Sequence, residues 1–242
     1  MSNKSLKAPQ DNQRYKQSSA RTAASPAQKR SEKRQSDLSK SDRDRFLRAT
    51  ASLKAQQGSY PEAIALLSQL LHRDPQNAID YNNRGLVYFQ AGQFDCAIAD
   101  YNKAVELNPR LANAYNNRAN YYAACGNLLA ALADYDRALD LNPSYVRAWI
   151  NRGITLRDLE RYEEAIENFD IALLLGQLNG HIYAERGRTY HLWGDWNCCV
   201  ADYRRALEVL PQHHGSSFDP ASRLRSQVEK ELNQLLGTTS NS

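Results

Sequence analysis

Asparagine and arginine side chains recur in this sequence at equal intervals. Asn83, Asn117 and Asn151 are evenly spaced, and an arginine directly follows each of them. An amide offers one acceptor and two donors, so a row of asparagines is suited to pair with the main chain of an extended peptide. An arginine held among helices usually needs a carboxylate partner. The equal spacing therefore indicates that both residue types recur at the same place of a repeated unit.

Residues suited to catalysis or metal binding form no usable set. No nucleophile stands at a workable spacing from a base, and no glycine loop of the phosphate-binding kind appears. The five histidines are scattered except for His213 and His214, which have no cysteine or carboxylate at ligand spacing. Cys198 and Cys199 are adjacent, and the four cysteines are interpreted as small apolar fillers in a reducing, intracellular setting. We expect no enzyme activity, no metal site and no cofactor.

Charge divides the 242-residue chain, whose net charge is +4, into two parts of opposite sign. Residues 1–40 hold ten lysines and arginines against three acidic residues, a net charge of +7, and the remainder sums to −3. The basic part has few large apolar residues, so it is predicted to be a disordered tail. Its arginine and serine content is also typical of an organelle transit peptide. No apolar run approaches the roughly 20 residues of a membrane span.

Beyond residue 44 the chain repeats itself. Pro75, Pro109 and Pro143 are evenly spaced; the next step falls on Gln177, and the series resumes at Pro211. Each block has two apolar stripes at spacings of three and four, and in every block but the fourth a glycine stands near the middle, where the fourth has Glu160. This pattern predicts a helix–turn–helix hairpin. The blocks are residues 44–77, 78–111, 112–145, 146–179 and 180–213.

The best block resembles the tetratricopeptide repeat (TPR) through Tyr81, Gly85, Tyr88, Gly92, Ala97, Tyr101, Ala104 and Pro109. The resemblance covers five blocks and implies an all-α, right-handed α-solenoid whose first helices line a concave groove. We expect the array to occupy residues 41–213 and a loop to occupy residues 214–219. A C-terminal capping helix is expected over 220–236 and a disordered end over 237–242, since Asp219 and Pro220 suit a helix start.

Four blocks place arginine where the family has an apolar residue, and the second helix of each of these blocks carries a polar partner at a constant place. The first block has neither change. We expect structural ion pairs that join the two helices of a hairpin or join neighbouring hairpins. The pairs are Arg84 with Asp100, Arg118 with Asp134, Arg152 with Asn168, and Arg186 with Asp202.

The resemblance also implies which places of each block line the groove. Their charged residues are Arg45, Arg48, Arg147, Arg157 and Arg188 against Asp158 and Glu185, so the groove is expected to be positive, at +3. A positive, amide-lined groove favours an acidic peptide or a free C-terminal carboxylate. The candidate peptide-binding residues are Asn82, Asn83, Asn113, Asn116, Asn117, Asn120, Arg147, Asn151, Arg157 and Arg188.

Two functions follow from these features. The first is a non-enzymatic adaptor or assembly factor that holds an extended segment of a protein partner in the groove. The alternative is a tether in which the basic tail binds nucleic acid or an anionic membrane and the repeats hold a protein cargo. Pairing of the tail with another copy would give a homo-oligomer, and polar residues that merely solvate the concave face would give no ligand. The expected location is cytoplasmic, with a membrane surface or an organelle as the alternatives.

Overall fold

The structure is a computed structural model that describes residues 39–211 and 219–239. The predicted basic tail, except for its last two residues, therefore lies outside the described residues. So do positions 214–218 of the predicted loop and the last three residues of the chain. The chain divides into two units, residues 1–43 and residues 44–242, and the second holds the repeats.

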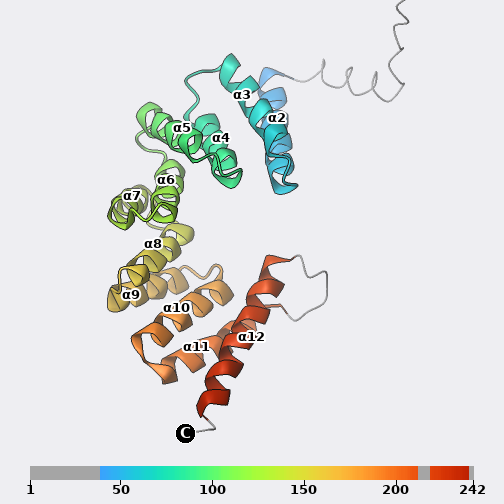
Figure 1. The fold of residues 1–242 in the computed structure, drawn as a ribbon. Coiled ribbons are helices and arrows are strands. Elements are labelled where there is room, and N and C mark those ends of the chain that lie inside the picture. The colour runs from blue at the N-terminus through green and yellow to red at the C-terminus, as the bar shows by residue number, and fades with distance from the viewer. Residues whose placement is uncertain (1–38, 212–218, 240–242) are drawn as a thin grey trace, which may run out of the picture. The chain divides into compact units, whose positions relative to one another are not determined.

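The described residues contain helices and no strand, so the predicted all-helical solenoid is confirmed. Figure 1 shows hairpins following one another in chain order, with α12 alongside α10 and α11. The last helix runs three residues past its predicted end at Leu236. Glycine is tolerated inside a helix at a cost of about 1 kcal/mol, so Gly237 alone does not end it. The helices are α2 Lys40–Gln56, α3 Tyr60–Arg73, α4 Ala78–Gln90, α5 Phe94–Leu107, α6 Ala112–Ala124, α7 Leu128–Leu141, α8 Val146–Asp158, α9 Tyr162–Leu174, α10 Asn179–Trp193, α11 Trp196–Val209 and α12 Pro220–Thr239.

The turn inside each hairpin needs one residue with a left-handed backbone. Gly58, Gly92, Gly126 and Gly194 supply it, with φ between 73° and 89°. Glycine adopts this conformation without the steric penalty that other residues carry. In the fourth hairpin Glu160 takes the same place with φ of 60°. The backbone shape of the turn is therefore kept even where the glycine is lost.

The two helices of a hairpin approach closely at small residues. At Gly187 on α10, an added Cβ would lie only 2.6 Å from the ring of Tyr203 on α11. That ring is fully buried, in a cluster that also contains Val228 and Leu232 of α12. The C-terminal helix thus covers the end of the stack. Its start is fixed by Asp219, whose carboxylate accepts a hydrogen bond from the Ser222 amide at 3.1 Å.

An arginine joins three helices at each junction between hairpins. Arg84 on α4 donates from Nε and Nη2 to both carboxylate oxygens of Asp100 on α5, at 2.7 and 2.8 Å. Its Nη1 donates to Ser68 on α3 of the preceding hairpin, at 3.0 Å. The guanidinium carbon lies 5.6 and 5.7 Å from the ring centres of Tyr81 and Tyr88. We call this arrangement the arginine clamp, and it acts both within a hairpin and between hairpins.

The clamp recurs in the third and fifth hairpins and is altered in the fourth. Arg118 bonds Asp134 in the same bidentate way, and Arg186 bonds Asp202. Arg152 has Asn168 at that place, bonded through Nη1 at 3.0 Å. Its charge is balanced instead by Asp136 on α7, with 2.7 Å between Nε and Oδ1. The outer partners of the other two arginines are Asn102 for Arg118 and Asp170 for Arg186.

Breaking one clamp should destabilise the array strongly. In Asp134→Ala the Arg118 guanidinium keeps only its neutral partner, so the free energy of unfolding should fall by about 3 kcal/mol. Asp140→Ala on the same helix is the matched control, because Asp140 is exposed and lies 3.9 Å from Arg137. That change should cost less than about 0.5 kcal/mol. Urea unfolding followed by circular dichroism measures both, and equal losses would contradict a structural role for the clamp.

A substitution at the turn residue Glu160 should stabilise the array. Glu160→Gly removes the penalty of a left-handed non-glycine residue and should raise the free energy of unfolding by about 0.5–1 kcal/mol. Gly126→Ala is the counterpart, since its φ is 77° and an added Cβ would have open space around it. It should lower stability by about 1 kcal/mol through the backbone alone. Thermal melts of the two variants test this, and shifts of the same sign would refute it.

Candidate functional site

The first helices of the middle hairpins line a groove of about 460 Å³. Its wall comes from α4, α6 and α8, and the start of α10 closes one end. At the other end it continues into a smaller cavity of about 300 Å³ between α2 and α4. We call it the amide groove, and its lining residues are Asn82, Asn83, Leu86, Gln90, Asn113, Asn116, Asn117, Asn120, Tyr145, Arg147, Ile150, Asn151, Leu178 and His181.

The amides in this groove are hydrogen-bonded to one another across three repeats. Asn117 Nδ2 donates to Asn82 Oδ1 at 2.9 Å, which joins α6 to α4. Asn151 Nδ2 donates to Asn120 Oδ1 at 2.9 Å, which joins α8 to α6. Each of these amides is thereby held in one orientation by its neighbour. The weaker links of the chain are Asn82 to Asn83 at 3.4 Å, Asn116 to Asn117 at 3.3 Å, and Asn151 to Asn116 at 3.4 Å.

Burial explains why the amides bond to each other. Asn82 and Asn116 are only 5% and 3% exposed, and the residue at the same place of the next repeat is the apolar Ile150. A buried amide without a partner would destabilise the fold, so the side chains one repeat away supply the missing bonds. Tyr135 on α7 adds a further bond from its hydroxyl to Asn120 Oδ1, at 2.6 Å. These asparagines thus form a polar layer, bonded between neighbouring repeats, that is part of the packing between the hairpins.

Asn113 and Arg147, both among the predicted groove residues, present side-chain polar groups with no partner among the described residues. Asn113 is exposed and forms no hydrogen bond there, and Arg147 is exposed and forms no ion pair there. Asn117 also keeps a second N–H, because its amide nitrogen donates one bond, to Asn82. These groups are the ones that a bound main chain or carboxylate would meet.

Arg157 and Arg188 were predicted to line the groove, and the structure places them elsewhere. Arg157 pairs with Glu185 at 2.8 Å, and Arg188 contacts Glu185 and also Glu231 of α12, the latter at 3.2 Å. Both arginine side chains are largely buried in this network. The positive charge of Arg157 and Arg188 is thus offset, and the prediction did not count the Glu231 carboxylate of α12. Arg48 is likewise neutralised, by Asp80 at 2.6 Å.

His181 lies at the end of the amide groove. Burial lowers the pKa of its imidazole below the ordinary value, and the nearby charges of Arg188 and Arg147 lower it further. Glu185 acts in the opposite direction. The imidazole is therefore neutral at physiological pH, and its nitrogens are one donor and one acceptor.

Several lining residues were not among the predicted ones. Leu86 and Gln90 stand on α4 at places assigned to the groove, but the prediction named only asparagines and charged residues there. Tyr145 and Leu178 belong to the linkers before α8 and α10, outside those places. Gln177, which stands where the other linkers have proline, was the one sequence signal that this part of the chain departs from the pattern.

Comparison with known proteins identifies the class of the chain. The model described as TPR repeat matches residues 52–92 and 85–126, and the model described as tetratricopeptide repeat matches residues 116–181. With the stacked hairpins above, this shows that the chain belongs to the tetratricopeptide-repeat family, whose arrays are in general non-catalytic scaffolds for protein interaction.

Solved structures share the fold. A crystal structure of MamA is 25% identical with a TM-score of 0.57, and the match covers 65% of this chain and 92% of that one. A thermophilic TPR protein of Thermus thermophilus is 21% identical with a TM-score of 0.67, over 78% of this chain and 98% of that one. Among curated proteins, none matches the sequence.

The described residues hold no group of three or more histidine, cysteine or acidic side chains that could bind a metal ion. In residues 39–211 and 219–239, no helix combines the length and the apolar character needed to cross a membrane.

The charges of Arg188 and Arg147 near His181 give a prediction for the pKa of its imidazole. Its pKa in the folded chain should lie below 6.5 and should rise in Arg147→Gln, which removes one positive neighbour. The unfolded chain binds a proton that the folded one lacks, so this residue's contribution to stability falls as the pH drops below about 6.5. NMR titration of the imidazole measures the pKa. Arg110→Gln, an exposed change outside the groove, should leave it unchanged, and an unshifted value in Arg147→Gln would contradict the placement.

Proposed function

We propose that this chain is a non-enzymatic adaptor or assembly factor that holds an extended, acidic segment of a partner protein in the amide groove. The observation that carries the proposal is the hydrogen-bonded row of asparagines across three consecutive repeats. Peptide main chain offers alternating donors and acceptors, and amides can satisfy both. Such recognition depends little on the sequence of the bound segment, which suits a scaffold.

The hydrogen bonds between amides make the groove suited to binding before any ligand arrives. Asn117 and Asn151 are each fixed by a bond of 2.9 Å to the preceding repeat. Side chains that are already ordered lose little entropy on binding, so more of the interaction energy appears as affinity. A surface of freely rotating polar side chains, which would merely solvate the concave face, lacks this order.

The proposed preference for an acidic partner segment depends on Arg147. It is exposed in the groove and has no carboxylate partner among the described residues, whereas Arg48, Arg157 and Arg188 are neutralised. An unpaired guanidinium attracts a carboxylate by charge and can bond it in a bidentate way. A single acidic residue, or a free C-terminus at this end of the groove, is therefore the favoured feature of the bound segment.

Substitutions that leave the fold intact test this proposal. Asn113→Ala and Arg147→Gln remove groups that make no internal bond, so they should weaken a bound acidic peptide by about 1 and 2 kcal/mol without changing the melting temperature. Asn117→Ala is less suitable alone, because it also removes the hydrogen bond to Oδ1 of the buried Asn82. The probe is a peptide selected from a random phage-displayed library on the full chain, and titration calorimetry measures its affinity.

Matched controls carry the same substitutions outside the groove. Asn197→Ala on α11 and Arg110→Gln before α6 change exposed residues. They should leave the affinity unchanged. Failure to select any peptide, or equal affinities for the groove and control variants, would contradict the proposed function.

A further inference from the structure

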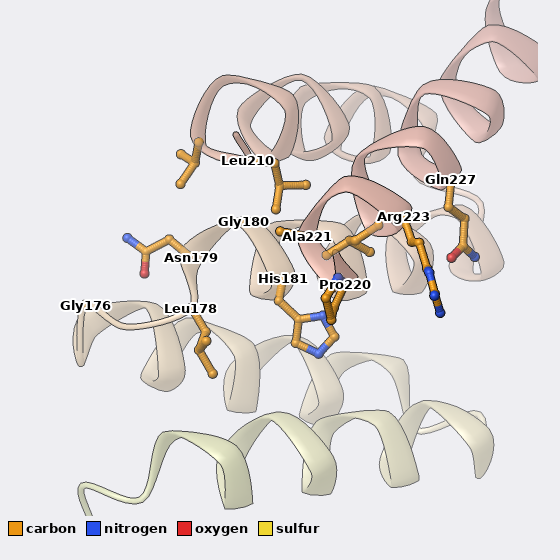
Figure 2. A pocket seen from close by; sticks show the side chains of 12 residues that line it. Gly176, Leu178, Asn179, Gly180, His181, Leu210, Pro220, Ala221, Arg223 and Gln227 are labelled. Atoms are coloured by element: carbon orange, nitrogen blue, oxygen red, sulfur yellow. The ribbon is translucent and has the colours of Figure 1, made fainter. Parts of the chain in front are cut away.

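A second, larger cavity of about 770 Å³ adjoins the amide groove at α10. Three segments surround it, namely the linker before α10 with the first turn of that helix, the end of α11, and the first two turns of α12. Figure 2 shows Leu210, Ala221 and His181 around it. Leu178 and Leu224 add further aliphatic surface. The cavity is thus mostly aliphatic, with polar groups at its margin.

The cavity exists because the fourth repeat ends irregularly. Gln177 replaces the linker proline, and Leu178 has a left-handed backbone with φ of 60°. Gly180 then packs closely, since a Cβ there would lie 2.8 Å from the Leu210 side chain. The linker therefore leaves the path that the other repeats follow, and Leu178 stays 45% exposed. An aliphatic recess of this kind suits a large apolar side chain.

The cavity and the groove are continuous. Leu178 and His181 line both of them, so a chain that follows the amides arrives at the cavity past these two residues. Arg147, the unpaired cation, lies on the groove side of the same boundary. The order along the surface is therefore amides, then a positive charge beside a neutral imidazole, then an aliphatic recess.

We propose that this cavity is the anchor pocket for the partner segment, which carries a large apolar side chain close to an acidic residue. The inference rests on the proposed function and adds the specificity that the amides lack. The apolar side chain enters the cavity while the neighbouring carboxylate meets Arg147. Charge complementarity with Arg147, which is exposed and forms no ion pair among the described residues, favours a peptide with an acidic residue.

Two substitutions change the cavity with little risk to the fold. Leu178→Asp places a carboxylate at the boundary, and aspartate tolerates a left-handed backbone better than leucine. Ala221→Trp fills the cavity from α12. The matched control is Leu174→Asp on α9, because Leu174 is 86% exposed and lines neither cavity.

The experiment uses peptides selected from the random library on the full chain, each compared with a version in which its largest apolar residue is alanine. We expect the selected peptides to carry such a residue within a few positions of an acidic one. The alanine version should bind the parent chain at least about tenfold more weakly. Ala221→Trp should weaken the original peptide by a similar factor and hardly affect the alanine version. Leu178→Asp should weaken both peptides, because its carboxylate also repels their acidic residue, and Leu174→Asp should change neither.

The outcomes separate this inference from the proposed function. Selected peptides that respond to Asn113→Ala and Arg147→Gln, yet have no apolar anchor or are insensitive to both cavity variants, would overturn the anchor pocket alone. Peptides insensitive to all four variants would overturn both. A doubled mass in solution that Leu178→Asp abolishes would assign the cavity to a second copy of the chain and overturn the peptide anchor.

Discussion

The bond between an arginine of one helix and an aspartate of the next determines the geometry of this array. Each clamp holds the two helices of a hairpin and reaches back to the preceding hairpin, as Arg84 does with Asp100 and Ser68. The bidentate bonds fix the direction of the guanidinium on its own hairpin, and its Nη1 bond to Ser68 then restrains that hairpin from rotating on the preceding one. The groove depends on this, because amides one repeat apart meet at 2.9 Å only if the repeats keep one orientation.

The polar layer is a compromise between stability and function. Ile150 shows that an apolar residue fits the place that Asn82 and Asn116 occupy, and an apolar core there would need no hydrogen bonds. Buried amides are tolerated because each has a partner in the next repeat, and a fully bonded network also specifies a single packing. A layer of amides is useful if the groove binds the main chain of a peptide, because apolar side chains cannot form hydrogen bonds with it.

The hairpins and their clamps could be predicted because both follow from spacing within the chain. A constant repeat length places Arg118 and Asp134 on facing helices whatever the tertiary detail, and the amides of neighbouring repeats align for the same reason. The pairing of Arg188 with Glu231 could not be predicted in this way. It depends on how α12 is rotated on the last hairpin, and α12 belongs to no repeat. The cavity was missed for a related reason, because its shape comes from an irregular linker and a helix outside the period.

Three departures from the repeat pattern lie in the fourth hairpin and the linker after it. Its turn has Glu160 in place of glycine, its clamp has Asn168 in place of aspartate, and its linker has Gln177 in place of proline. Each of these three residues favours the regular repeat structure less than the residue it replaces. Selection for stability alone would not favour all three changes. The linker freed by the third change places Leu178 and His181 where the amide groove meets the cavity. A proline at position 177 would restrict its own φ and would disfavour a helical conformation in the residue before it. Both restrictions would keep this linker on the path that the other linkers follow. The irregular fourth repeat thus places a large aliphatic recess beside the amide groove, and the proposed anchor pocket would account for this loss of regularity.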